Sequence, residues 1–272
     1  MKELNGREIA DFVKERQAKA VRGLRQQWKV APKLAIIRTN PDPVVDSYMK
    51  LKQRYGDDIL IDVEVHTIDQ SEALTKIQEL NADDSVHGII VQIPLPDRSQ
   101  TDEILGAVSP DKDVDGLSAE SKFDAATPLA IIWLLAGYDI DLTNRQVLVV
   151  GRGRLVGAPL ITMLEQSDIY PLHADRETQN LAEMTRRADV IISATGVPGV
   201  ITADMVKPDA IIVDAGVATD SNGLVGDVDQ SVRELPNVTI TPIKGGVGPL
   251  TVAALFENVI TAARRTIEIK HQ

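Results

Sequence analysis

The chain has 272 residues, of which 43% are hydrophobic and 25% are charged. This composition is ordinary for a globular protein and argues against wholesale disorder, while the length suits one large domain or two modest ones. The formal net charge is −11. Because a chain with this charge repels phosphate backbones, we expect no nucleic-acid partner.

The sequence contains no cysteine, which excludes disulfide bonds and thiol catalysis. Its histidines, at 66, 87, 173 and 271, lack the spacing of a zinc site, so we expect no metal. The charged amphipathic segment 1–17 predicts a helix and lacks the apolar core of a signal peptide. No apolar run approaches the roughly 18 residues of a membrane span. We therefore expect a cytoplasmic protein without a membrane partner.

Short apolar runs alternate with helical patterns along the chain, which is typical of parallel sheets with helices on their faces. In the first half, amphipathic spacing predicts a helix at 71–80, and apolar runs predict strands at 34–37, 61–68 and 88–94. A second series of apolar runs predicts strands at 147–150, 169–173, 189–195, 210–216 and 238–243. Two such series predict an α/β fold with two lobes.

The segment SYMKLK, residues 47–52, places Tyr48 and Lys52 four residues apart. In a helix, residues at this spacing lie on one face, so the ring and the ammonium group would share a pocket. Taken alone, the pair is more typical of a solvated helix surface.

Two longer segments connect the lobes. The run TPLAIIWLLAGY at 127–138 predicts a linking helix with Thr127 as its N-cap and Pro128 in its first turn. The run at 250–269 has helical apolar spacing and predicts a C-terminal helix that returns to the first lobe and covers a cleft between the two.

These boundaries predict an N-terminal α/β substrate domain at 1–125, joined by the C-terminal helix at about 250–272. Residues 126–249 are predicted to form a Rossmann-type parallel-sheet nucleotide domain.

A glycine-rich turn lies between a predicted strand and an apolar helix. It contains Gly151, Gly153 and Gly157, a GxGxxxG pattern one residue longer than the usual dinucleotide fingerprint. Small residues here let backbone amides approach a pyrophosphate at the helix N-terminus. An ordinary strand–helix turn explains a lone glycine triplet equally well, but this one opens a βαβ series, which favours dinucleotide binding.

The residues after the next strand bear on the choice of cofactor. An acidic residue there hydrogen-bonds the ribose of NAD, whereas a basic one accommodates the 2′-phosphate of NADP. The sequence offers Asp175 and Arg176 side by side, with Arg152 inside the glycine turn. These cues conflict, and each residue is also compatible with ordinary solvated surface.

Five further motifs stand out: VQIPLP (91–96), PDKDVDG (110–116), ATP (126–128), GLVGDVD (223–229) and TPIKGGVGPLT (241–251). A calcium loop in PDKDVDG is excluded, since Lys122 stands where the closing glutamate would be. The run KGGVGP suits either a flexible linker or a backbone-lined wall of a ligand site.

Together and in order, these motifs resemble the bifunctional methylenetetrahydrofolate dehydrogenase/methenyltetrahydrofolate cyclohydrolase family, over about residues 30 to 262. The resemblance implies two α/β lobes, a folate-binding catalytic lobe and an NAD(P)-binding lobe. It implies that Lys52 is the main catalytic residue, that Tyr48 lies against the pterin–aminobenzoate part of folate, and that Gln92 hydrogen-bonds near Lys52. It further implies that Asp115 holds the pterin ring, and that the cleft is bordered by Gly245, Gly246 and Pro249.

The chemistry implied is oxidation of 5,10-methylenetetrahydrofolate and hydrolysis of the methenyl product to 10-formyltetrahydrofolate, in one-carbon metabolism. A partly buried Lys52 would have a lowered pKa, which suits proton transfer at neutral pH. Two arginines outnumber one carboxylate, so we expect NADP as the cofactor, with NAD possible. The resemblance also implies a homodimer formed through the nucleotide lobe.

Three alternatives remain open at this point. The first is an NAD-preferring or dehydrogenase-only member of the same family. The second is a shikimate- or amino-acid-type dehydrogenase, but this interpretation does not explain the motifs VQIPLP and GGVGP. A third alternative, of another class, is a non-catalytic nucleotide-binding protein.

Overall fold

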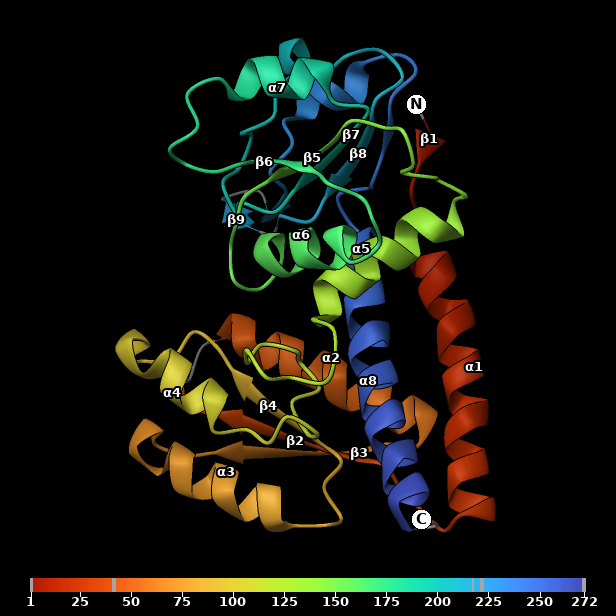
Figure 1. Cartoon of the computed structure of the whole chain (residues 1–272), viewed down its shortest axis with the longest axis vertical. Coiled ribbons are helices and arrows are strands. Elements are labelled where there is room, and N and C mark those ends of the chain that lie inside the picture. Colours follow the sequence, from red (N-terminus) through yellow and green to blue (C-terminus); the bar gives the residue numbers. More distant parts are fainter. Residues whose placement is uncertain (1, 41–42, 217, 221–222, 271–272) are drawn as a thin grey trace. The chain divides into compact units, whose positions relative to one another are not determined.

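The computed structural model describes residues 2–40, 43–216, 218–220 and 223–270, and the chain divides into two compact units (Figure 1). We call Phe12–Ala126 with Val252–Gln272 the N-lobe, and Met1–Asp11 with Thr127–Thr251 the C-lobe. The long helices α1 (Gly6–Gln27) and α8 (Val247–Lys270) contribute residues to both lobes, because the division falls within them.

Within the described residues, the N-lobe contains a three-stranded parallel sheet in the order β3–β2–β4. Its strands are β2 (Lys33–Arg38), β3 (Asp62–Thr67) and β4 (Gly88–Gln92). Its shorter helices include α2 (Pro43–Ile59), α3 (Ala73–Ala82) and α4 (Thr101–Gly106). The strands predicted in the first half of the chain and the helix predicted at 71–80 are confirmed, with small shifts at their ends.

The central strand of this sheet is buried on both faces. Leu34, Ala35, Ile36 and Ile37 are all fully buried, which explains why β2 reads as a continuous apolar run and not as an alternating one. On one face, apolar side chains of β2 and β4 pack with those of α3 and α4, among them Ile37, Ile77, Ile89 and Leu105.

A buried glutamine ties the long helices of the N-lobe to α2. The side-chain amide of Gln17 on α1 donates to the carbonyl of Ala253 on α8 at 2.8 Å and accepts from the Tyr55 hydroxyl on α2 at 2.8 Å. The Tyr55 ring also stacks on Phe256 of α8, with ring centroids 5.0 Å apart. These contacts fix the helix that carries Tyr48 and Lys52.

In the described part of the C-lobe, six strands form one parallel sheet in the order β1–β11–β8–β7–β5–β6 (Figure 1). They are β1 (Lys2–Glu3), β5 (Val147–Val150), β6 (Leu172–Ala174), β7 (Val190–Ser193), β8 (Ile211–Asp214) and β11 (Thr239–Ile240). The helices are α5 (Ala126–Gly137), α6 (Gly157–Glu165) and α7 (Leu181–Arg187), together with the start of α8. The predicted α/β class and the Rossmann-type sheet are confirmed.

The order of these strands locates the ligand-binding edge of the sheet. The chain passes from β5 to β6 on one side and then returns to place β7 on the other side of β5. Ligands of open α/β sheets bind at the carboxyl ends of the strands at such a reversal. The glycine turn follows β5 directly, so it lies at this edge.

Several predicted boundaries were wrong. The strand predicted at 169–173 begins only at Leu172, because the Ile169 amide donates to Leu164 and closes the end of α6. The strand predicted at 238–243 is reduced to β11, since Pro242 has no amide hydrogen to continue the ladder. The linking helix begins at Ala126, which places Thr127 inside α5 and not at its N-cap.

Two features were not predicted. The N-terminus forms strand β1 beside β11 before α1 begins at Gly6, whereas a helix was predicted over 1–17; position 1 lies outside the described residues. An antiparallel hairpin of β9 (Ala218–Asp220) and β10 (Gly223–Val225) precedes the GDVD motif. No described helix is both long and apolar enough to span a membrane.

Candidate active site

Helix α2 presents Tyr48 and Lys52 on one face, as their spacing predicted. Pro43 is its first residue, a position where the missing amide hydrogen costs no hydrogen bond. The Tyr48 side chain is 44% exposed, whereas Lys52 is half-buried. The helix therefore offers an accessible ring one turn before a lysine that is partly withdrawn from solvent.

Gln92 is the last residue of β4, and its side chain meets Lys52. The ammonium nitrogen of Lys52 lies 3.3 Å from Oε1 of Gln92, to which it donates. The amide nitrogen of Gln92 donates to the Ile93 carbonyl at 3.1 Å, which leaves Oε1 to face the lysine. The structure thus brings together a lysine and a glutamine that are 40 positions apart in the sequence.

Burial and a carboxylate act on Lys52 in opposite directions. Burial lowers the pKa of Lys52, and the negative charge of Asp115 opposes this by favouring the ammonium form. Burial also raises the pKa of Asp115, an effect that the Lys52 charge opposes and the Asp113 charge reinforces. Because burial is the larger effect on both groups, the neutral amine is easier to form than in solution.

The charged residues of the turn PDKDVDG have different roles. The Lys112 ammonium donates to the carbonyls of Leu80, Asn81 and Asp83, at 3.0, 2.9 and 2.8 Å, and so caps the end of α3. The buried Asp113 carboxylate accepts from the Ser118 amide at 2.8 Å. Lys112 and Asp113 therefore hold the turn in place, and Asp115 is the carboxylate of this turn whose charge acts on Lys52.

The glycine-rich loop before α8 belongs to the C-lobe. Gly245 has φ +91°, a conformation that favours glycine, and its carbonyl accepts from the Arg7 amide at 3.1 Å. A Cβ on Gly6 would lie 2.0 Å from the Gly246 carbonyl oxygen, so the loop packs directly against the start of α1. Pro249 lies in the first turn of α8. The sequence did not indicate that this loop rests on the N-terminal segment.

Two of the three glycines in the nucleotide turn are sterically required. Gly151 has φ +98°, and a Cβ there would lie 2.6 Å from the Ala194 carbonyl oxygen. A Cβ on Gly157 would lie 1.8 Å from the Gly151 carbonyl oxygen. Around Gly153, in contrast, a Cβ would meet none of the described atoms within 4 Å, so this position does not require glycine.

This turn fits the pyrophosphate of a dinucleotide. Helix α6 begins at Gly157, and among the described residues no side chain caps its N-cap Val156. The Ala158 amide donates to the Gly153 carbonyl at 3.1 Å and Pro159 has no amide hydrogen, so the feature of α6 that favours an anion is the positive end of its dipole. The turn also follows β5 at the strand reversal of the sheet. Backbone geometry and position both suit a phosphate group.

The residues that bear on cofactor choice are all exposed. Asp175 follows β6, and its Oδ1 accepts from the Glu177 amide at 3.0 Å and from the Thr178 hydroxyl at 3.3 Å. The carboxylate is therefore engaged in closing its own turn. Arg152 and Arg176 extend from exposed positions in the glycine turn and beside Asp175.

The GDVD motif supplies a buried carboxylate near the carboxyl end of β7. Asp227 is 1% exposed, and its Oδ2 accepts from the Ser193 hydroxyl at 2.7 Å and from the Thr195 amide at 2.6 Å. Asp214, at the end of β8, accepts from the amides of Asp227 and Val228 at 3.0 and 3.1 Å. These bonds fix the loops that follow β7 and β8. Ser193 and Asp214 were not predicted, because nothing in their local sequence distinguishes them.

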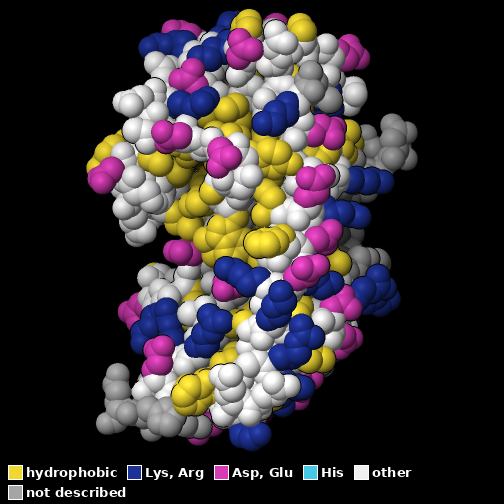
Figure 2. All heavy atoms as spheres, turned by 90° about the vertical axis from the view of Figure 1, so that its right-hand side faces the viewer, with side chains coloured by type: hydrophobic (Ala, Val, Ile, Leu, Met, Phe, Trp, Pro, Cys, Tyr) yellow, Lys and Arg dark blue, Asp and Glu magenta, His cyan; other side chains and the backbone are white. Residues whose placement is uncertain are grey.

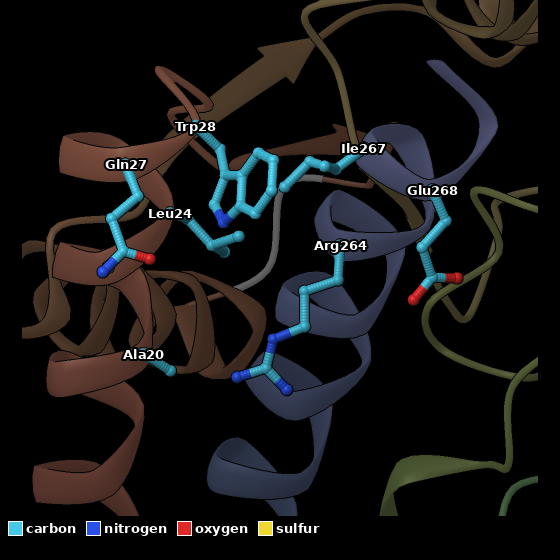
Figure 3. A pocket seen from close by; sticks show the side chains of 8 residues that line it. Ala20, Leu24, Gln27, Trp28, Arg264, Ile267 and Glu268 are labelled. Carbon is cyan, nitrogen blue, oxygen red and sulfur yellow. The ribbon is translucent and has the colours of Figure 1, made fainter. Parts of the chain in front are cut away.

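A separate pocket of about 490 Å³ lies in the N-lobe between α1 and α8 (Figure 3). Trp28 and Leu24 approach Ile267 across it, and Arg264 extends toward Ala20. On this side of the molecule, Lys and Arg side chains gather over the N-lobe part of the two helices (Figure 2). Neither Lys52 nor any other residue predicted for catalysis lines the pocket, so it is distinct from the candidate active site.

Both lobes match families of known proteins. Residues 4–115 match the tetrahydrofolate dehydrogenase/cyclohydrolase catalytic domain, and residues 125–267 match the NAD(P)-binding domain of the same family. The bifunctional protein FolD of Exiguobacterium sibiricum is 36% identical over an alignment 275 positions long, which covers 96% of this chain and 99% of the relative.

Solved structures agree with this assignment. The bifunctional FolD dehydrogenase/cyclohydrolase of Campylobacter jejuni has a TM-score of 0.93 at 35% identity and covers 98% of this chain and 99% of its own. The Trypanosoma brucei enzyme, solved with NADP cofactor and an inhibitor, has a TM-score of 0.90 at 27% identity, with 97% of each chain covered. The resemblance drawn from the motifs is confirmed, and the chain belongs to the tetrahydrofolate dehydrogenase/cyclohydrolase family.

Proposed function

We propose that this protein oxidises 5,10-methylenetetrahydrofolate to 5,10-methenyltetrahydrofolate with NADP and hydrolyses the product to 10-formyltetrahydrofolate. The observation that carries the proposal is the contact of Lys52 with Gln92 at 3.3 Å, at a lysine whose pKa is lowered by burial. This arrangement provides an amine that loses its proton more readily than an exposed lysine does.

In the hydrolytic step, water adds to the methenyl carbon and one of its protons must leave before the ring opens at N5. Neutral Lys52 accepts this proton, and Gln92 orients the amine by accepting one of its hydrogens. As the amine becomes an ammonium, the Asp115 carboxylate stabilises the new charge. The proton count balances, since the methenyl cation and water yield the neutral formyl compound and one proton.

Substrate placement falls to Tyr48 and Asp115. The accessible Tyr48 ring offers a flat apolar surface for the pterin–aminobenzoate part of folate, one helical turn from the amine. The Asp115 carboxylate accepts hydrogen bonds from the pterin ring. In this proposal, the backbone of Gly245 and Gly246 and the ring of Pro249 also contact the folate.

The C-lobe holds the dinucleotide at the glycine turn. A bound nicotinamide would supply the acceptor for the hydride that the methylene carbon loses on oxidation to the methenyl cation. Gly151 and Gly157 permit the close packing of the turn, and the positive end of the α6 dipole favours the pyrophosphate. Gly153 belongs to the same turn, with open space around the place of a Cβ.

The preference for NADP rests on the arginines. Arg152 and Arg176 are exposed and able to pair with the 2′-phosphate, whereas the Asp175 carboxylate is engaged by the amide and hydroxyl of its own turn. Two hydrogen bonds to Oδ1 therefore restrain this side chain at its own turn. An NAD-preferring member of the family is the alternative, and it requires Asp175 to leave this turn.

A homodimer through the C-lobe is part of the proposal. Strand β6 lies at the end of the sheet order, and Tyr170 and Leu172 beside and within it are 76% and 50% exposed. An edge strand with exposed apolar side chains is suited to pair with another chain. A second copy of this chain would cover both. The cytoplasmic location expected from the sequence stays a prediction.

The proposal is tested by following absorbance of purified protein supplied with methylenetetrahydrofolate and NADP, then NAD. NADPH formation with subsequent loss of the methenyl band supports both activities. Nucleotide binding without turnover would favour the non-catalytic alternative. A methenyl band that accumulates and decays only at the uncatalysed rate would favour a dehydrogenase-only enzyme.

A further inference from the structure

The side chain of Asn258 is a buried polar group on an otherwise apolar stretch of α8. It is 6% exposed, and its neighbours Val259 and Ile260 are fully buried. The amide nitrogen donates to the Val114 carbonyl and to the Asp124 carbonyl, both at 2.9 Å. Both hydrogens of one amide group are therefore used on the backbone of one loop.

The two carbonyls stand at the two ends of the segment that contains Asp115. Val114 precedes Asp115 directly, and Asp124 closes the segment nine residues after it. The ends also touch one another, since a Cβ on Gly116 would lie 2.6 Å from the Ala125 amide nitrogen. We call the place where these two ends meet, at Val114 and Asp124, the neck of the 114–124 loop. Asn258 on α8 thus holds both sides of this neck.

The interior of the loop is closed by its own polar groups. The Asp113 carbonyl accepts from the Gly116 amide at 3.2 Å and from the Ser121 hydroxyl at 2.9 Å. These bonds shape the loop but do not attach it to a helix. Two side chains of α8 attach this loop: Asn258 holds its neck through the two bonds above, and Arg265 donates to the Lys122 carbonyl within the loop at 3.5 Å.

We propose that Asn258 is a positioning residue for the active site, which holds the neck of the 114–124 loop so that the Asp115 carboxylate keeps its place relative to Lys52 and the pterin ring. The inference rests on the proposed function, in which Asp115 binds the pterin. The sequence alone did not indicate it, although an asparagine within the apolar run VAALFENVITAA is the signal that would have done so.

The proposal has a specific electrostatic consequence. The Asp115 charge raises the pKa of Lys52 against the lowering effect of burial. If the neck loosens and Asp115 moves away, the supporting charge weakens while burial remains. The pKa of Lys52 then falls further, and the neutral amine required for hydrolysis persists to lower pH.

The test uses Asn258→Leu in the full-length protein. Leucine has nearly the shape of asparagine but donates no hydrogen bonds, so packing is kept while the two carbonyls lose their donor. We expect the KM for methenyltetrahydrofolate to rise at least about fivefold, as for a misplaced binding group, with a smaller change in kcat. We also expect the acidic limb of the hydrolysis pH profile to shift to lower pH.

Two further variants separate positioning from general destabilisation. Asn258→Ser keeps one donor and should give the same changes at reduced size, and it carries the test if the leucine variant does not fold. Val259→Ala removes buried volume from the adjacent position of α8 without removing any hydrogen bond. It should lower the melting temperature while leaving the KM and the pH profile as in the wild type.

Wild-type KM and an unshifted pH profile in folded Asn258→Leu and Asn258→Ser would overturn the positioning role. The same shifts in Val259→Ala would overturn it as well, because they would show that any loosening of α8 suffices. Failure of the proposed function would give a different result from failure of the positioning role. The wild type would then show no turnover, or Asp115→Ala would leave the KM unchanged.

Discussion

The Lys52 ammonium lies 3.3 Å from the carbonyl oxygen of the Gln92 side chain, which faces it because its own amide nitrogen is committed to Ile93. The lysine comes from a helix and the glutamine from the end of a strand, so their meeting is a property of the fold. The carbonyl oxygen holds the amine in position without adding a full negative charge, while burial lowers the pKa of Lys52.

Replacing Lys52 with methionine should abolish the hydrolysis of methenyltetrahydrofolate and leave folate affinity within roughly tenfold, because a general base contributes mainly to rate. The measurement is turnover followed at the methenyl absorbance, alongside a folate-binding titration. Lys50→Met, two positions earlier on α2 at an exposed site, is the matched control and should keep full activity. Undiminished hydrolysis by the Lys52 variant would refute its role.

Replacing Gln92 with glutamate should move the pH dependence of hydrolysis. A carboxylate at this distance favours the ammonium form and raises the pKa of Lys52. The neutral amine then forms only at higher pH, so the acidic limb of the pH profile should shift upward. Gln100→Glu adds the same charge at an exposed position of the N-lobe and should leave the profile in place. A downward shift in Gln92→Glu would contradict the assignment.

Replacing Asp115 with alanine should weaken folate binding by about 1.5–3 kcal/mol, as expected for the loss of a hydrogen bond to a charged group. Equilibrium titration with folate measures the effect. Asp111→Ala removes an exposed carboxylate of the same turn that pairs with Lys122 at 2.8 Å, and it should bind folate as the wild type does. A collapse of thermal stability in Asp115→Ala, with affinity kept in the folded fraction, would instead indicate a structural turn.

Replacing Arg152 with alanine should raise the KM for NADP by roughly tenfold or more and leave the KM for NAD unchanged, because only NADP carries the 2′-phosphate. Steady-state kinetics with both cofactors measure the difference. Arg186→Ala, which removes an exposed arginine paired with Asp204 elsewhere in the C-lobe, controls for the loss of positive charge. Equal or better turnover of the wild type with NAD would show that Asp175 decides the preference.

Replacing Leu172 with lysine should shift the protein toward monomer, since a charge on an edge strand opposes pairing with a second copy. Sedimentation equilibrium at several concentrations measures the association. Leu155→Lys places the same charge at another exposed leucine of the C-lobe, outside the sheet, and should leave the association unchanged. A monomeric wild type would contradict the proposed dimer directly.

The sequence by itself determined the features that depend on neighbouring residues. Strand β2 and the helix predicted at 71–80 followed from local apolar patterns, because periodicity is set by the geometry of each element. Gly151 and Gly157 could be recognised from their spacing. The structure supplies the reason, because a Cβ at either position would clash with a backbone carbonyl oxygen. The order of the motifs was sufficient to indicate the family.

The tertiary structure decided the features that join distant positions. The sequence did not separate Lys112, which caps α3, from Asp115, whose charge acts on Lys52, because both stand in one acidic turn. Nor did it connect Asn258 with that turn, or Asp214 with Asp227. Burial and the approach of charges arise only when elements far apart in the chain pack together, and these two effects set the pKa of Lys52.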